Sequence, residues 1–164
     1  MRTRNIKIWI SDSVLDSMRA LADSSFPQET GGLLMGYFDD QSKDVVVTDI
    51  IGPGPKGSHK RMSFVPDYEF QEKEIARIYE ETNRTSTYLG DWHTHPKGHA
   101  SLSGQDLNTL CNIAFYPKAR VPSPIMVLLA GNKAQWQVRF WQLQTTRRFF
   151  WKKTTLVNLN SHTF

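Results

Sequence analysis

The stretch Gly90-Asp-Trp-His-Thr-His-Pro-Lys-Gly-His-Ala-Ser-Leu-Ser-Gly-Gln-Asp106 determines how the rest of this chain is interpreted. It continues from Ser86-Thr-Tyr-Leu, a pattern typical of a β-strand, and Pro96 ends that strand. Side chains of a strand repeat every two residues, so His93 and His95 are expected to point to the same face.

A helix should begin shortly after this strand. Ser103 is placed as its N-cap, and the helix is expected to run to about Phe115. Asp106 then lies on the first turn, where its carboxylate can face back toward the two histidines. Imidazole nitrogens and a carboxylate oxygen suit Zn²⁺, and three protein ligands leave open the fourth position that catalytic zinc sites keep for water.

The elements around this stretch indicate an α+β fold rather than a regular βαβ array. Before the histidines we expect a strand over 6–10, a helix after an N-cap at Ser11 or Asp12, and a hairpin of 32–38 with 45–51. A flexible basic loop over 52–61, a short strand over 62–65 and a helix capped by Asp67 should follow. After the histidines we expect a late hairpin of 122–130 with 134–141 and a last strand over 143–156. For the helix after Asp67, the expected buried stripe includes Tyr68 and Ile78. The absence of a long linker predicts a single domain over 1–164.

Composition excludes several protein classes. The chain has 164 residues, of which 39% are hydrophobic and 22% charged, so it is not expected to be disordered. Its longest apolar run, Ile125–Ala130, is far shorter than the roughly 20 residues of a membrane span, so no membrane partner is expected. Cys111 is the single cysteine, which excludes an internal disulfide framework. With no secretory signal apparent at the N-terminus, the expected location is the cytoplasm.

Charge is unevenly distributed along the chain. Residues 1–106 carry twelve basic and sixteen acidic residues, whereas residues 107–164 carry eight basic residues and no acidic one. This difference has two interpretations that the sequence leaves open. The basic part could attract an acidic partner, protein or nucleic acid. Alternatively, its lysines and arginines could be solvated residues that protect exposed strand edges.

Two segments together resemble a known family, the JAB/MPN metallo-isopeptidases. His93-Thr-His-Pro96, followed after six residues by Ser103-X-X-Asp106, matches the family's JAMM motif. Upstream, Glu29-Thr-Gly-Gly-Leu-Leu-Met-Gly36 resembles its Glu-X-X-Gly-X-Leu-X-Gly strand. The resemblance implies a mixed, mainly antiparallel β-sheet flanked by about three helices, in a JAB/MPN-like and cytidine-deaminase-like architecture.

The resemblance also implies roles for five residues. His93, His95 and Asp106 would bind one zinc ion, Glu29 would be the general acid/base, and Ser103 would help to stabilise the oxyanion. Eukaryotic members usually have Gly-Trp-Tyr before the first histidine, where this chain has Gly-Asp-Trp. This difference points toward a small bacterial stand-alone form.

The activity that the resemblance implies is zinc-dependent hydrolysis of the amide between a protein's C-terminus and a target lysine. The pattern resembles deconjugating peptidases of anti-phage operons, whose substrate is a conjugated cyclic-oligonucleotide synthase. Three alternatives remain: a peptidase that processes a ubiquitin-like or sulfur-carrier precursor, a non-catalytic MPN-type scaffold, and a DNA-associated module suggested by the basic C-terminal part. Neighbouring genes would distinguish the isopeptidase from the processing peptidase. A scaffold should lack metal ligands that this chain has.

Some nearby residues have two readings. Asp91 shares the expected strand face of the histidines, so it could orient an imidazole or be a solvated strand acid. His59 and His99 lie in loops, where they could contact substrate or simply face solvent. Cys111 follows the apolar positions of its helix and is expected to pack in the core.

Overall fold

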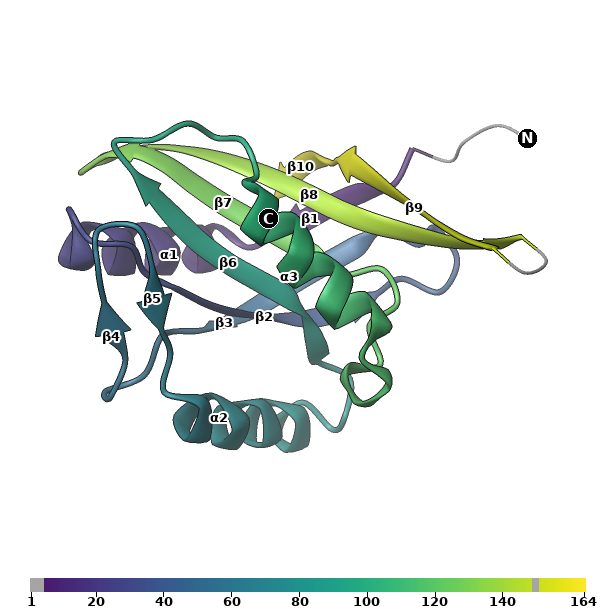
Figure 1. Cartoon of the computed structure of the whole chain (residues 1–164). Coiled ribbons are helices and arrows are strands. Elements are labelled where there is room, and N and C mark those ends of the chain that lie inside the picture. The colour runs from purple at the N-terminus through teal and green to yellow at the C-terminus, as the bar shows by residue number, and fades with distance from the viewer. Residues whose placement is uncertain (1–4, 149–150) are drawn as a thin grey trace.

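The computed structural model of the chain describes residues 5–148 and 151–164. An eight-stranded mixed sheet forms its centre, with the strand order β10-β1-β3-β2-β6-β7-β8-β9 (Figure 1). The strands are β1 (Lys7–Ile10), β2 (Gly31–Phe38), β3 (Val45–Ile51), β6 (Thr87–Pro96), β7 (Ile125–Asn132), β8 (Gln135–Arg148), β9 (Trp151–Asn158) and β10 (Asn160–Thr163). Three neighbouring pairs are parallel, β1–β10, β1–β3 and β6–β7, and the other four are antiparallel. The expected α+β class with a mainly antiparallel sheet is confirmed.

The three expected helices are present as α1 (Asp12–Ser25), α2 (Tyr68–Glu81) and α3 (Gly104–Phe115), and a 3₁₀ turn follows at Pro117–Ala119. Each begins where the sequence supplies a capping side chain. The side chains of Ser11, Asp67 and Ser103 accept hydrogen bonds from backbone N–H groups in the first turn.

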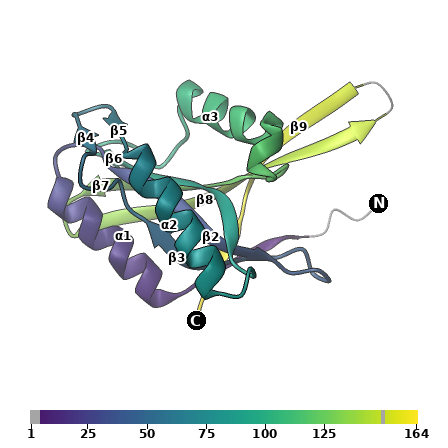
Figure 2. The same ribbon diagram turned by 90° about the horizontal axis from the view of Figure 1, so that it is seen from below.

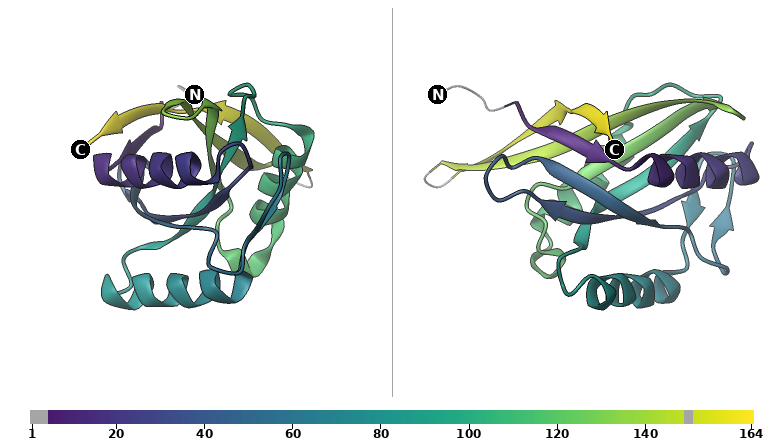
Figure 3. Two further views of the ribbon diagram at one scale, coloured as in Figure 1. Left: turned by 90° about the vertical axis from the view of Figure 1, so that its left-hand side faces the viewer. Right: turned by 180° about the vertical axis from the view of Figure 1, so that it is seen from behind.

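The helices lie on opposite faces of the sheet. Helix α1 packs Met18 against Ile8 and Val47 of the largest apolar cluster, whereas Ile78 of α2 and Leu110 of α3 belong to separate clusters on the other face. Figure 3 shows β2 and β3 passing between α1 and α2. Two pockets lined by residues of α2, α3 and the sheet lie between these helices, and the functional residues described below line one of them.

Three sequence-based expectations require correction. The segment predicted as a loop over 52–61 contributes β4 (Ser58–His59), which pairs with β5 (Phe64–Val65) in a small second sheet. The region 143–156 is not one strand: it divides between β8 and β9, which form a hairpin that projects past α3 (Figure 2). Tyr68 is not buried but 70% exposed, because the inward positions of α2 are Gln71 and Ile78.

No helix in the described part of the chain combines the length and the apolar character that crossing a membrane requires.

Candidate metal centre

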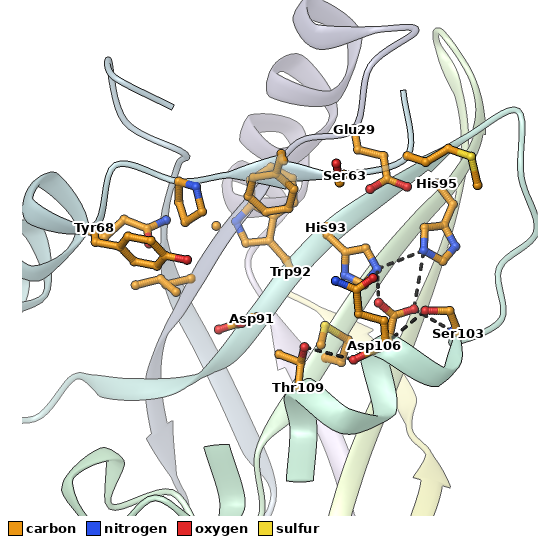
Figure 4. Close-up of a pocket in the computed structure, with 18 residues that line it drawn as sticks. Glu29, Ser63, Tyr68, Asp91, Trp92, His93, His95, Ser103, Asp106 and Thr109 are labelled. Atoms are coloured by element: carbon orange, nitrogen blue, oxygen red, sulfur yellow. Dashed lines mark hydrogen bonds and ion pairs between the residues drawn. The ribbon is translucent and has the colours of Figure 1, made fainter. Parts of the chain in front are cut away.

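Strand β6 and helix α3 bring three potential metal ligands together. Nε2 of His93 lies 3.1 Å from Nε2 of His95 and 3.1 Å from Oδ1 of Asp106, and Nε2 of His95 lies 3.5 Å from Oδ2 of Asp106. Figure 4 shows the two imidazoles and the carboxylate converging at one end of a pocket. His93 is only 8% exposed, so its ring has little access to bulk water except through this pocket.

The sequence around the histidines explains this placement. Because side chains alternate along β6, Trp92 and Thr94 point to the opposite face of the strand and are buried, whereas His93 and His95 face α3. Strand β2 runs antiparallel alongside, with Gly31 opposite His93. A Cβ atom at Gly31 would stand 2.3 Å from the backbone oxygen of Trp92 and 2.9 Å from Cβ of His93. Only a glycine therefore fits beside the histidine.

A capping box fixes Asp106. Its Oδ2 accepts a hydrogen bond of 2.6 Å from the Ser103 backbone N–H, and its own N–H donates to the Ser103 hydroxyl at 3.2 Å. Burial acts to raise the pKa of Asp106, but hydrogen bonds and charge from His93, together with the Ser103 bonds, outweigh it and lower the pKa to about 2. Asp106 is thus ionised at neutral pH, as a metal ligand must be.

His95 is prepared to act as a neutral ligand. Burial and the neighbouring His93 lower its pKa below the ordinary value for histidine. Its Nδ1 faces the backbone oxygen of His99 at 3.3 Å, an arrangement that leaves Nε2 for a metal ion. The His99 side chain itself is exposed, so the contribution of this residue comes from its backbone.

The donor set and its spacing fit zinc. Four ligands at about 2.0–2.1 Å from a tetrahedral zinc ion lie about 3.3 Å from one another. The separations from His93 Nε2 to His95 Nε2 and to Asp106 Oδ1, both 3.1 Å, are close to two of those edges. One ligand atom from each of the three residues lies within 4.8 Å of the other two. Two imidazole nitrogens and one carboxylate would leave one position of a tetrahedral zinc ion without a protein ligand.

Glu29 reaches the same pocket from the segment before β2. Figure 4 shows its carboxylate pointing toward the imidazoles. A buried pair holds this segment to β6, because the Thr30 N–H donates to Oγ1 of Thr94 at 3.0 Å and the Thr94 N–H donates to the Thr30 oxygen at 2.9 Å. Burial raises the pKa of Glu29, an effect that His93 opposes and Asp106 reinforces. A carboxyl group with a raised pKa exchanges protons near neutral pH more readily than an ordinary glutamate.

The small sheet of β4 and β5 fixes Glu29 from its other side. The Glu29 N–H donates to the backbone oxygen of Lys60 at 2.8 Å, and Nδ1 of His59 lies 2.9 Å from the Glu29 oxygen. His59 therefore contacts the backbone of the candidate acid/base, a role that its position in a basic loop did not indicate.

The pocket has a volume of about 320 Å³, and further lining residues include Tyr68, Asp91 and Thr109. Asp91 shares the face of His93 as expected, but the partner in its hydrogen bond is the Tyr88 hydroxyl at 2.6 Å rather than an imidazole. Burial raises the pKa of Asp91, opposed by that hydrogen bond and by His93. Cys111 is half-buried and packs against the cluster around Leu110, as expected.

Sequence reasoning missed Thr30, Thr94, Tyr88 and the backbone role of His59. Thr94 stands between the two histidines and could have been singled out by its position. Nothing local in the sequence marks the others, because their contacts join segments from 30 to 64 residues apart or depend on an irregularity in β6.

Comparisons with known proteins show the family of this chain. The family model of prokaryotic homologues of the JAB domain matches residues 11–144. A protein of Sinorhizobium fredii named "Probable metalloprotease y4qB" is 41% identical over 142 residues, which cover 86% of each chain. A protein of Enterobacter hormaechei named "CD-NTase/cGAS isopeptidase" is 25% identical over 128 residues, covering 77% of this chain and 69% of that one.

The fold has a counterpart among solved structures. The solution structure of protein DSY2949 from Desulfitobacterium hafniense aligns over 96% of this chain and 92% of its own, with a TM-score of 0.64 and 17% sequence identity. That likeness concerns the fold alone. With a family model that spans most of the sequence and a relative at 41% identity, the chain belongs to the prokaryotic JAB-domain family.

Proposed function

We propose that this protein is a zinc-dependent metallo-isopeptidase. Its substrate would be the amide between the C-terminus of a ubiquitin-like or otherwise conjugated protein and a target lysine. The observation that carries the proposal is the arrangement of two imidazoles, an ionised carboxylate and a separate carboxyl group, Glu29, around one pocket. The names of the relatives, a metalloprotease and an isopeptidase, support the same chemistry.

In this proposal His93, His95 and Asp106 hold one zinc ion per chain. A zinc ion there would supply a nucleophile at neutral pH by lowering the pKa of water to about 7, and it would polarise the scissile carbonyl. Glu29 takes the proton from the attacking water and transfers it to the departing lysine amine. Its raised pKa suits both steps, since the group must accept a proton and then release it.

Ser103 assists at the developing oxyanion. Its oxygen accepts a hydrogen bond from the Asp106 N–H, and its hydroxyl hydrogen is free to rotate toward the pocket and donate to the substrate oxygen. A serine can thus cap α3 and stabilise a transition state with different atoms of the same group.

We further propose that the substrate is a protein conjugated in bacterial anti-phage defence, such as a cyclic-oligonucleotide synthase. This assignment is supported by the names of three relatives at 25% identity, from Enterobacter hormaechei, Escherichia coli and Vibrio cholerae. A scaffold without activity would not need the full donor set that this chain retains.

The test uses a defined conjugate. A protein joined through its C-terminal carboxylate to the ε-amino group of a lysine in a second protein is incubated with the zinc-loaded enzyme. We expect two products, identified by intact mass, with water added across the isopeptide bond. An unchanged conjugate, together with cleavage of a linear precursor at the same C-terminus, would instead favour a processing peptidase.

A further inference from the structure

Asp91 is a pocket residue that the chemistry above does not use. It lies on β6 two residues before His93, on the same strand face, which places it about 7 Å from that histidine along the strand. Figure 4 shows it on the Tyr68 side of the imidazoles. It therefore faces the part of the pocket that lies between the imidazoles and the start of α2.

An irregularity in β6 fixes its carboxylate. The pairing of β2 with β6 moves from Leu34↔Gly90 to Met35↔Tyr88, so Leu89 is an extra, bulged residue. Residues three apart in a regular strand face opposite ways, but this bulge turns Tyr88 to the face of Asp91, where the hydroxyl donates to Oδ1 at 2.6 Å. Gly90 makes the bulge possible, since its φ is +146° and a Cβ there would lie 1.9 Å from the Ile125 oxygen.

The second oxygen of Asp91 has no partner of its own. Within residues 5–148 and 151–164, its described hydrogen bond involves Oδ1 alone, and the ion pairs at the site use Asp106. Neither lysine nor arginine lines the pocket, whereas three carboxylates do: Glu29, Asp91 and Asp106. A divalent ion held by Asp106 and the imidazoles would still leave Asp91 without a cationic partner among the residues that line the pocket.

We infer that Asp91 forms a specificity subsite for a cationic side chain of the substrate tail, located two residues from the cleaved bond. This inference rests on the proposed isopeptidase function. An extended chain repeats its side chains every two residues, over about 7 Å. A tail that lies along β6 with its scissile carbonyl at the imidazoles therefore presents its next same-face side chain to Asp91. Tyr88 is a positioning residue, because its hydroxyl holds the carboxylate and it is not among the residues that line the pocket.

A positional library tests the inference. Random octapeptide tails are joined through their C-terminal carboxylate to the ε-amine of a lysine reporter, and cleaved tails are identified by mass spectrometry. The best tail is then made with arginine or with its neutral isostere citrulline at the position of interest. Hydrogen bonds to charged groups are strong enough that kcat/KM should favour arginine by at least about tenfold. The Kd for binding to the Glu29→Gln protein, measured by fluorescence anisotropy, should show the same preference.

Variants separate this role from a structural one. Asp91→Asn keeps an acceptor for Tyr88 and removes the charge, so the arginine-to-citrulline ratio should fall to near one. Tyr88→Phe should give an intermediate ratio, and the exposed acid Asp16 supplies a matched control, since Asp16→Asn should keep the wild-type ratio. If Asp91→Asn kept the wild-type ratio, or if wild type showed no preference, the subsite would be refuted. Failure of the zinc-loaded wild type to cleave any tail would refute the proposed function itself.

Discussion

Replacing Ser103 by alanine should separate helix capping from catalysis, because the chain contains a matched cap elsewhere. Ser103 accepts a hydrogen bond from the Asp106 N–H at 3.2 Å, and Ser11 accepts one from the Val14 N–H at the same 3.2 Å. Both serines are N-caps in an extended conformation. Loss of either cap should therefore lower the free energy of unfolding by about 1 kcal/mol and Tm by about 2–4 °C.

Only the Ser103 variant should lose activity. Ser103 lines the pocket, and removal of an oxyanion donor typically lowers kcat by roughly 10²–10³-fold. The backbone N–H of residue 103 still donates to Oδ2 of Asp106 in Ser103→Ala, so zinc content should remain that of the wild type. Ser103→Gly adds a second check, because glycine caps cost only a few tenths of a kcal/mol while the hydroxyl is still lost.

The assays are urea unfolding, zinc content and steady-state kinetics on a purified conjugate, for Ser11→Ala, Ser103→Ala and Ser103→Gly. A kcat of Ser103→Ala within threefold of that of Ser11→Ala would refute the role of the hydroxyl in the transition state. Equal stability losses with unequal kcat values would support it.

Three further predictions concern other parts of the site. Glu29→Gln should retain one zinc ion but lose hydrolysis, and turnover within a few-fold of wild type would exclude Glu29 as the proton carrier. Neutralising the exposed Lys56, Lys60 and Arg61 should raise KM and weaken its salt dependence with little change in kcat, as kinetics at two salt concentrations would show; a collapsed kcat with unchanged KM would contradict this. Gly31→Ala should lower the free energy of unfolding by about 1–3 kcal/mol, measured in urea, because its Cβ would overlap the neighbouring strand; a stability equal to wild type would show that the strands separate without cost.

The parts of the fold that the sequence predicts are those with strong local signals. The helix caps at Ser11, Asp67 and Ser103 and the alternation before Pro96 act within a few residues, so single-sequence reasoning finds them. The hairpin of β8 and β9 was missed because residues 143–156 contain neither glycine nor proline to mark a turn. Strands β4 and β5 have two residues each, too few for a periodicity to be visible.

For the candidate site, the motif spacing predicts which side chains meet but not what holds them. His93, His95 and Asp106 are positioned by a strand period and a helix cap, both of which are local. The bonds of Thr94 to Thr30 and of His59 to the Glu29 backbone join distant segments. The pairing of Tyr88 with Asp91 depends on a bulge that regular alternation would not predict. These contacts follow from the pairing register, which the sequence does not specify position by position.

Zinc content per chain tests whether His93, His95 and Asp106 hold a metal ion. Wild type, His95→Ala and His99→Ala are stripped with a chelator, reloaded with a small excess of zinc, desalted and measured by mass spectrometry of the metal. His99 is the matched control, because its side chain is exposed and only its backbone oxygen meets His95. We expect one zinc ion per chain in wild type and His99→Ala and a loss of that ion in His95→Ala. One retained zinc ion per chain in His95→Ala would contradict the ligand set of His93, His95 and Asp106.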